Sequence, residues 1–265
     1  PRFKYFHRPD EHLPGGNGAR NYGFKMSQGD YVNWFDSDDL MLPDKLNDQL
    51  NLFFKNKNIN VVFCECTTFF KNKKEIQILN HYHINTENFI EDYVLRRLQA
   101  QTGTALWDIK IFQNFEYKEE LIQSQDYELY SRIFFYSPIV KVLNKSLVMV
   151  RKNHNSISAN FETSSLVEIK SFVKANSSLI FYYENKIKIQ LALLNKIILS
   201  LNSNLNKGLN FKILKFYFFE VDKLIDQSPN LKKHKLKWIF LKILSLVIFK
   251  INKGAYRFRE FYKFN

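Results

Sequence analysis

The segment at residues 31–39 constrains the fold of this chain more than any other. An apolar and aromatic run, Tyr-Val-Asn-Trp-Phe, is followed directly by Asp36, Asp38 and Asp39. Carboxylates this close together repel one another, and a divalent cation held by hard oxygen ligands removes that conflict. The pattern therefore predicts a buried strand whose carboxyl end opens into an acidic metal site. Asp-Ser-Asp-Asp is also good chemistry for a plain turn, so that alternative stays open.

The flanks of the acidic segment favour the metal site. Gly29 and Asp30 mark a turn before the strand, and Pro43 stands where a helix would begin, with a fixed φ and a missing donor suited to the first turn. Asp44 then falls in the electropositive first turn of that helix. Ligand sites in open α/β sheets lie at the carboxyl ends of strands, which is where this acidic loop falls.

Hydrophobic periodicity predicts the other elements of this part of the chain. It indicates helices at 18–27, 43–54, 87–97 and 126–135, strands at 59–68, 75–79, 139–143 and 147–151, and an extended segment at 102–107. Ser124 is expected to cap the helix that starts at Asp126. Cys64 and Cys66 flank Glu65 in a strand, where a disulfide would be strained, so we expect reduced thiols of a cytosolic protein.

Three ordered motifs resemble the core of the family 2 glycosyltransferases. The first motif contains Ala19-Arg20-Asn21 and Gly29-Asp30-Tyr31. It continues with an Asp-x-Asp segment, Phe35-Asp36-Ser37-Asp38-Asp39, and ends at Pro43. The second, Gln125-Asp126-Tyr127-x-Leu129-x-x-Arg132, is similar to the family's Glu-Asp-Tyr-x-Leu-x-x-Arg helix start. The third, Arg151-x-x-His154-Asn155-Ser156-Ile157-Ser158, is similar to a segment that often closes the catalytic domain. The resemblance covers residues 1–160.

The resemblance implies an α/β, Rossmann-like GT-A domain. Such a domain would move a sugar, with inversion, from a nucleotide-sugar donor to a saccharide or lipid-linked acceptor in cell-surface polysaccharide synthesis. It would use Mg²⁺ or Mn²⁺, which carboxylate ligands favour. Asp38 is the expected main metal ligand, with Asp36 on the ribose or on the metal through water. Asp126 is the expected general base. His154 is a further candidate metal ligand, and the candidate donor or acceptor contacts are Arg20, Asn21, Asp39, Trp107 and Gln125.

Each assignment has a structural alternative. Asp126 could only stabilise a helix end, Trp107 could only pack in the core, and Arg20 could only pin the acidic loop. Asp39 could anchor that loop instead of facing the sugar, and a lone His such as His154 is more often structural. For the whole chain, the alternatives are a non-catalytic membrane- or polyanion-binding module with a degenerate transferase fold, or another metal-dependent nucleotidyl or phosphoryl transferase.

The chain begins with Pro1 and not with Met. In the resembled family, a strand and a second βαβ unit that bind the nucleotide base precede the Ala-Arg-Asn segment. We therefore expect residues 1–160 to be a partial GT-A domain without its N-terminal strands; the alternative is a divergent chain that begins here. The same argument predicts that this fragment alone is inactive.

The remainder, residues 161–265, is expected to be α-helical, with helices at 164–183, 185–201, 209–226 and 231–251. Residues 238–249 are strongly apolar, too short for a transmembrane span, and flanked by lysines. A basic amphipathic helix that lies among lipid headgroups fits this pattern better. The formal net charge of +13 also suggests an anionic partner. We expect contact with an anionic membrane at the cytoplasmic face and, because no binding motif is present, no nucleic acid partner.

Overall fold

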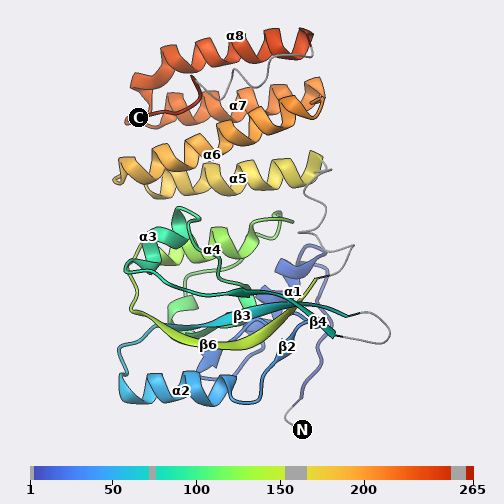
Figure 1. Cartoon of the computed structure of the whole chain (residues 1–265), viewed down its shortest axis with the longest axis vertical. Coiled ribbons are helices and arrows are strands. Elements are labelled where there is room, and N and C mark those ends of the chain that lie inside the picture. The colour runs from blue at the N-terminus through green and yellow to red at the C-terminus, as the bar shows by residue number, and fades with distance from the viewer. Residues whose placement is uncertain (1–2, 72–75, 153–165, 252–260) are drawn as a thin grey trace. The chain divides into compact units, whose positions relative to one another are not determined.

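The computed structural model of the chain describes residues 3–71, 76–152, 166–251 and 261–265. The chain divides into two compact units, residues 1–164 and residues 165–265 (Figure 1). The first is a mixed α/β unit, and the second is built from helices. Each unit buries its own set of apolar side chains.

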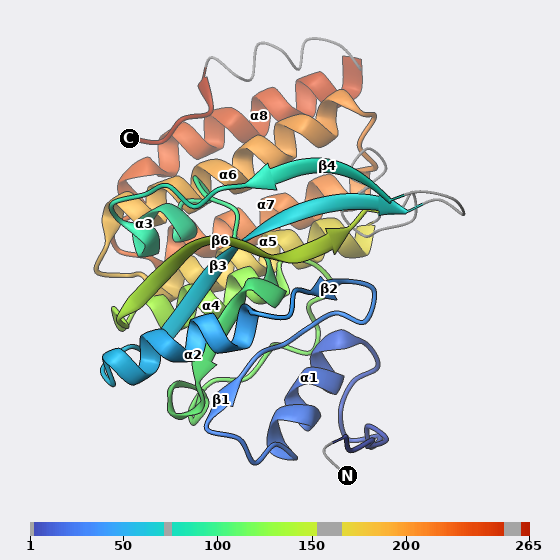
Figure 2. The same ribbon diagram turned by 60° about the horizontal axis from the view of Figure 1, so that its bottom comes forward.

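A mixed sheet forms the centre of the first unit. Its strands follow the order β1-β5-β3-β6-β2. Strand β5 pairs with the N-terminal part of β3, and β4 pairs with the C-terminal part on the same edge. Strands β3 and β6 pair in parallel and lie side by side in Figure 2, whereas the other described strand pairs are antiparallel. The strand bounds are Tyr31–Val32 for β1, Leu40–Met41 for β2, Val61–Lys71 for β3, Ile76–Tyr82 for β4, Ala105–Asp108 for β5 and Val140–Arg151 for β6.

Helices cover both faces of this sheet, because side chains alternate along a strand. Val62 packs with Phe53 of α2 on one face, whereas Phe63 packs with Tyr130 and Phe134 of α4 on the other. Figure 1 accordingly shows α2 on one side of the sheet and α3 and α4 on the other. The helices of this unit are α1 (Gly16–Lys25), α2 (Lys45–Lys55), α3 (Phe89–Val94) and α4 (Gln125–Phe134), with 3₁₀ turns at Thr102–Thr104 (η1) and Ile109–Phe112 (η2).

Three expectations for these elements need correction. The strand before the acidic loop is two half-buried residues, not a long buried run, because from Asn33 onward the backbone leaves the sheet. Pro43 lies two residues before α2, so Asp44 takes the N-cap position. Residues 140–151 form one strand rather than two, because its register along β3 jumps from Leu143 to Ser146. The polar residues between these positions form a bulge. In the sequence, their polarity looks like the end of one strand and the start of another.

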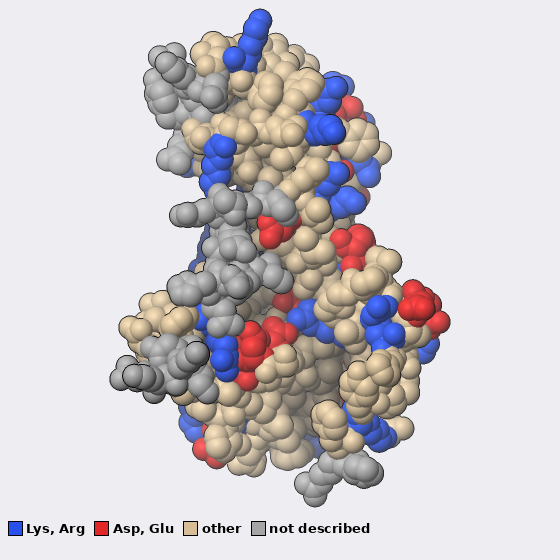
Figure 3. Space-filling model, turned by 90° about the vertical axis from the view of Figure 1, so that its right-hand side faces the viewer, with Lys and Arg blue, Asp and Glu red and all other residues tan. Residues whose placement is uncertain are grey.

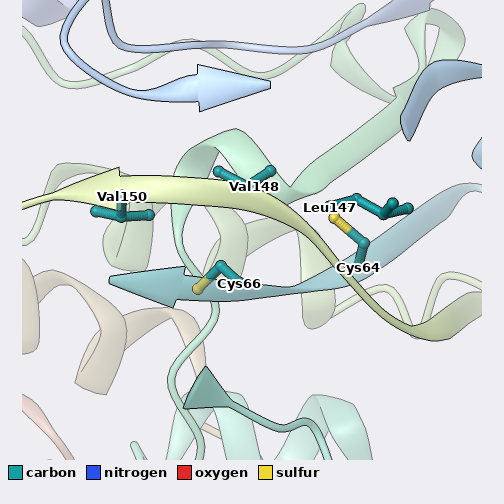
Figure 4. Close-up of a cluster of buried hydrophobic side chains, with 5 residues drawn as sticks. All are labelled: Cys64, Cys66, Leu147, Val148 and Val150. Atoms are coloured by element: carbon teal, nitrogen blue, oxygen red, sulfur yellow. The ribbon is translucent and has the colours of Figure 1, made fainter. Parts of the chain in front are cut away.

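The two cysteines are free and buried, as the prediction of reduced thiols requires. Cys64 and Cys66 pack with Leu147, Val148 and Val150 in a small apolar cluster between β3 and β6 (Figure 4). Burial raises the pKa of Cys64 to about 11 and that of Cys66 to about 12. Both thiols are therefore protonated at neutral pH, and they serve as apolar packing groups.

The described part of the second unit contains four long helices, close to the predicted ranges. They are α5 (Leu166–Tyr182), α6 (Ile187–Asn206), α7 (Phe211–Gln227) and α8 (Lys235–Ile251), with a 3₁₀ turn, η4 (Lys232–His234), before α8. The Asn210 side chain caps α7 by accepting a hydrogen bond from the Lys212 N–H. None of the helices in the described ranges is long and apolar enough to cross a bilayer.

Candidate active site

Hydrogen bonds to neighbouring backbone hold the acidic loop in place. The Asn33 amide donates to the carbonyl of Gly103 (3.2 Å) and to that of Ala105 (2.7 Å). Further along, the Asp39 N–H donates to the Asp36 carbonyl (3.2 Å) and closes a turn. The segment therefore follows a short strand and contains a turn. The metal site at this loop stays a prediction.

Arg20 links three elements that are distant in the sequence. From α1, its Nη2 donates to Asp36 Oδ1 in the acidic loop (2.9 Å), and its Nη1 donates to Gln125 Oε1 at the start of α4 (3.0 Å). Burial alone would lower the pKa of Arg20, but the negative charges of Asp126 and Asp36 outweigh it and raise this pKa. The guanidinium therefore carries a fixed positive charge between the acidic loop and the predicted base.

The Asp126 carboxyl group uses one oxygen and leaves the other without a partner. Its Oδ2 accepts a hydrogen bond from the Thr102 hydroxyl, whereas Oδ1 is buried and has no hydrogen-bond partner among the described residues. Ser124 stands at the N-cap of α4, but its backbone is left-handed (φ 60°) and its side chain makes no capping bond. The predicted N-cap position is confirmed, but the capping bond is absent, because the Ser124 hydroxyl instead accepts from Arg96 (3.0 Å).

The end of β6 clamps the second half of the acidic loop. The Arg151 N–H donates to Asp39 Oδ1 (2.8 Å), and the Arg151 side chain donates to the Asp38 carbonyl (2.9 Å). Asp39 therefore anchors the loop, which was one of its two expected roles. The Asp38 side chain is exposed and has no hydrogen bond or ion pair within the described ranges. His154 lies outside the described residues.

Two of the candidate ligand-binding side chains are instead engaged with other residues of the chain. Trp107 is 0% exposed and packs against Phe112 and Tyr130, so its structural alternative holds. The Asn21 side chain donates to the Tyr117 carbonyl and accepts from the Tyr117 N–H, each at 2.9 Å. This pair of bonds ties α1 to the segment before α4. We therefore assign no ligand to Trp107 or to Asn21.

A family model described as glycosyl transferase family 2 matches residues 1–135, about half of the chain. The chain belongs to glycosyl transferase family 2.

The relatives of this family 2 chain include uncharacterized bacterial glycosyltransferases. One from Rickettsia bellii is 29% identical over 160 residues, which are 58% of this chain and 22% of the relative. One from Haemophilus influenzae is 40% identical over 68 residues, which are 24% of this chain and 26% of the relative. The chain thus spans about a quarter of the length of these relatives.

A solved structure supports the GT-A fold of the family 2 chain. The crystal structure of residues 1–349 of S. aureus TarS, in complex with UDP-GlcNAc, superposes with a TM-score of 0.53 and 14% sequence identity. The match covers 84% of this chain and 72% of that one. The mixed sheet with helices on both faces is therefore a GT-A fold, as the motifs predicted, and it is joined to a helical C-terminal part.

The acidic loop has the donor chemistry for a hard divalent cation. In the described ranges, no three His, Cys, Asp or Glu side chains lie close enough together to form a metal site by themselves. Mg²⁺ is commonly held by one or two carboxylates, with waters and substrate phosphates completing the shell. The exposed carboxylates of Asp36 and Asp38 fit that requirement, and a third carboxylate, Asp39, adds negative charge beside them.

Sequence reasoning missed two polar residues of this family 2 site. Thr102, which holds Asp126, gave no signal beyond its place in a Thr-Gly-Thr segment. Lys45 is 0% exposed in α2, and its Nζ lies 3.4 Å from Asn33 Oδ1. Its charge has no carboxylate partner in the part of the chain that the structure describes.

We expect Lys45→Met to stabilise the protein. Burial lowers the pKa of Lys45 to about 8. Because the charge is disfavoured in the folded state, the variant should raise the free energy of unfolding by about 1–3 kcal/mol at pH 7. The gain should shrink as the pH rises from 8 toward the unfolded pKa, since the folded wild type then loses its proton first. Urea denaturation at several pH values measures both effects, and Lys55→Met, on the exposed end of α2, is the control.

Asp39→Asn is also expected to be stabilising in metal-free buffer. Burial, and then the charges of Asp38 and Asp36, raise the pKa of Asp39 to about 6 against the hydrogen bond from Arg151. The folded state therefore favours the proton, and the wild type loses stability as the pH rises through 4 to 6. Asn keeps the acceptor for Arg151 without the charge. We expect a gain of about 1–3 kcal/mol at pH 7 that vanishes below pH 4 in urea denaturation with EDTA. A destabilised variant at pH 7 would contradict this.

Proposed function

We propose that this family 2 chain carries the catalytic residues of an inverting, metal-dependent transferase. Its donor is a nucleotide sugar, and its acceptor is a saccharide or a lipid-linked glycan. The observation that carries the proposal is the juxtaposition of Asp126 with the acidic loop through Arg20. The complex of TarS with UDP-GlcNAc supports a nucleotide-sugar donor for a chain of this fold.

The acidic loop is the proposed binding place for the donor diphosphate. Asp38 and Asp36 would hold Mg²⁺ or Mn²⁺, which when bound acts as a Lewis acid on the departing diphosphate. Arg20 adds a guanidinium on the same side, and arginine suits phosphate oxygens. A pocket of about 470 Å³ lies beside Arg20, between α1 and residues 31–35, which lead into the loop, and Tyr31, Asn33 and Trp34 are among its lining residues.

Asp126 is the proposed general base. Thr102 fixes one carboxyl oxygen, and the partnerless Oδ1 would accept the proton of the acceptor hydroxyl. As that proton moves to Asp126, the acceptor oxygen forms a bond to the anomeric carbon and the bond to the nucleoside diphosphate breaks. Attack on the face opposite the leaving group inverts the anomeric centre. Gln125 orients Arg20 beside this exchange.

The proposed setting is cell-surface polysaccharide synthesis at the cytoplasmic face of the membrane. A lipid-linked acceptor would be presented there, and nucleotide sugars are cytoplasmic substrates. The basic helical unit, residues 165–265, supports this setting because anionic lipids attract lysine and arginine side chains.

Product analysis tests the reaction class. The product of the complete reading frame is incubated with a panel of nucleotide sugars and Mn²⁺, and the released nucleotide is identified. Glycosyl transfer or donor hydrolysis releases a nucleoside diphosphate, and EDTA should abolish the release. A nucleoside monophosphate, pyrophosphate or phosphate product would favour a nucleotidyl or phosphoryl transferase instead. No turnover of any donor would favour the non-catalytic binding module.

A further inference from the structure

One face of helix α8 anchors the helix to its unit, and on the other side Phe240 contacts Phe261 (ring centroids 5.7 Å). Trp238, Leu241, Ser245 and Ile248 are buried on that face. The Trp238 indole N–H also donates to Asp222 of α7 (2.8 Å), and Lys242 pairs with the same carboxylate (2.7 Å). These contacts leave most of the opposite side of α8 exposed.

The opposite face of α8 is apolar as well. Leu236 is 81% exposed, Ile243 57% and Ile251 61%. Together with their exposed apolar neighbours on the helix they recur at intervals of three and four residues, so they fall on one side of it. We call this set the α8 stripe: Leu236, Ile239, Phe240, Ile243, Leu246, Val247 and Ile251. A run of exposed apolar residues this long on one helix marks an interaction surface.

The charge of the chain is concentrated in the unit that carries this stripe. Residues 165–265 contain 19 Lys and Arg but 6 Asp and Glu, so they account for the whole net charge of +13. In Figure 3 blue side chains accordingly predominate over red ones in the helical unit. The residues of the first unit have balanced charges.

Lysines surround the α8 stripe. Lys232 and Lys233 lie just before α8, Lys250 lies in its last turn, and all three are exposed. Within the described ranges, none of the three forms an ion pair, in contrast to Lys235 and Lys242. A second copy of this surface would bring like charges together, and a nucleic acid would not bury the apolar stripe. An anionic bilayer offers both an apolar layer and negative headgroups.

We infer that the α8 stripe docks in the headgroup region of an anionic bilayer, with the surrounding lysines on acidic headgroups. The helix lies in the plane of the interface, because its buried face packs on its own unit and the stripe lies along the other side. The inference gives the membrane contact proposed above a defined surface, and so it rests on that part of the proposed function. It does not depend on the transfer reaction.

Vesicle flotation of the 265-residue chain tests the inference. The chain is mixed with vesicles of phosphatidylcholine alone, or of phosphatidylcholine with phosphatidylglycerol, in the absence of donor and acceptor. We expect flotation with the anionic vesicles and a loss of binding at high salt. Equal binding to neutral vesicles, or no binding to either kind, would overturn the inference.

Variants locate the contact. Ile243→Glu should lower partition onto anionic vesicles tenfold or more, because burial of an Ile side chain contributes about 1.5–3 kcal/mol. Lys250→Gln should lower it about fivefold, since a headgroup-facing Lys contributes about 1 kcal/mol. Leu199→Glu, on exposed α6 surface, is the matched control and should bind like the wild type. Equal loss with Leu199→Glu would overturn the inference.

Two further readouts separate this inference from its competitors. A dimer in lipid-free buffer that Ile243→Glu dissociates would assign the α8 stripe to a second copy of the chain, and would overturn membrane docking. In the complete gene product, nucleoside diphosphate release from a soluble donor should be unchanged by Ile243→Glu. Flotation without turnover, or turnover without flotation, shows which of the two proposals has failed.

Discussion

Asp126→Asn is expected to lower kcat about a thousandfold, within the range that general-base catalysis contributes. Asn keeps the size of the side chain and can still accept the hydrogen bond from Thr102 through its carbonyl oxygen. It cannot take a proton from an acceptor hydroxyl at neutral pH. The initial rate of transfer by the complete gene product, at saturating donor and metal, measures the effect.

The alternative role of Asp126, stabilisation of the α4 helix end, predicts a different pattern. Asp92 is the matched control, because it lies in the first turn of α3 and also accepts a hydrogen bond from a threonine, Thr86. Asp92→Asn should leave kcat unchanged, and both variants should unfold within a few degrees of the wild type. A large loss of stability in Asp126→Asn without a selective loss of rate would assign Asp126 to the helix end.

Asp38→Asn is expected to lower kcat/KM about a hundredfold and to raise the Mn²⁺ concentration needed for half-maximal rate. Removing one preorganised charge contact to a leaving group typically has an effect of this size. The Asp38 side chain has no partner in the described ranges, so its carboxylate is available to a cation. For the same reason the substitution should not destabilise the fold, and relief of repulsion should stabilise it slightly.

The control for Asp38→Asn is Asp44→Asn. Asp44 is another exposed carboxylate close by in the sequence, and at the N-cap of α2 it makes no side-chain capping bond. The control should retain the Mn²⁺ dependence of the wild type. Unchanged activity in Asp38→Asn would remove the acidic loop from the reaction.

The motifs and the helices could be predicted because each is encoded locally. The Asp-x-Asp loop, the start of α4 and the four C-terminal helices follow from patterns a few residues long. The predictions that proved wrong concern places where strand pairing or another tertiary contact determines the local structure. The bulge at Asn144 and Lys145 keeps β6 continuous, because β3 lies alongside it over its whole length. At Ser124 the backbone is left-handed and the hydroxyl bonds to Arg96, a tertiary contact that a local pattern does not reveal.

The composition of the site was foreseen better than its internal contacts. The sequence identified Arg20, Asp36, Gln125 and Asp126 as candidates, but not that one guanidinium lies between them. The sequence could not show that Trp107 is a core residue, because an aromatic residue in a core and one in a ligand cleft look alike in sequence. The packing of Trp107 against other aromatic rings in the structure shows that it belongs to the core.

The double contact of Arg20 has a consequence for how such a site can evolve. The residues at positions 36 and 125 share this single cation, so the effect of changing one depends on the other and their substitutions are not additive. In the motif that this chain resembles, position 125 carries a glutamate, which would compete with Asp36 for the same charge. With Gln125 in its place, the acidic loop keeps more of that charge. Positions 36 and 125 should therefore covary among relatives that retain an arginine at position 20.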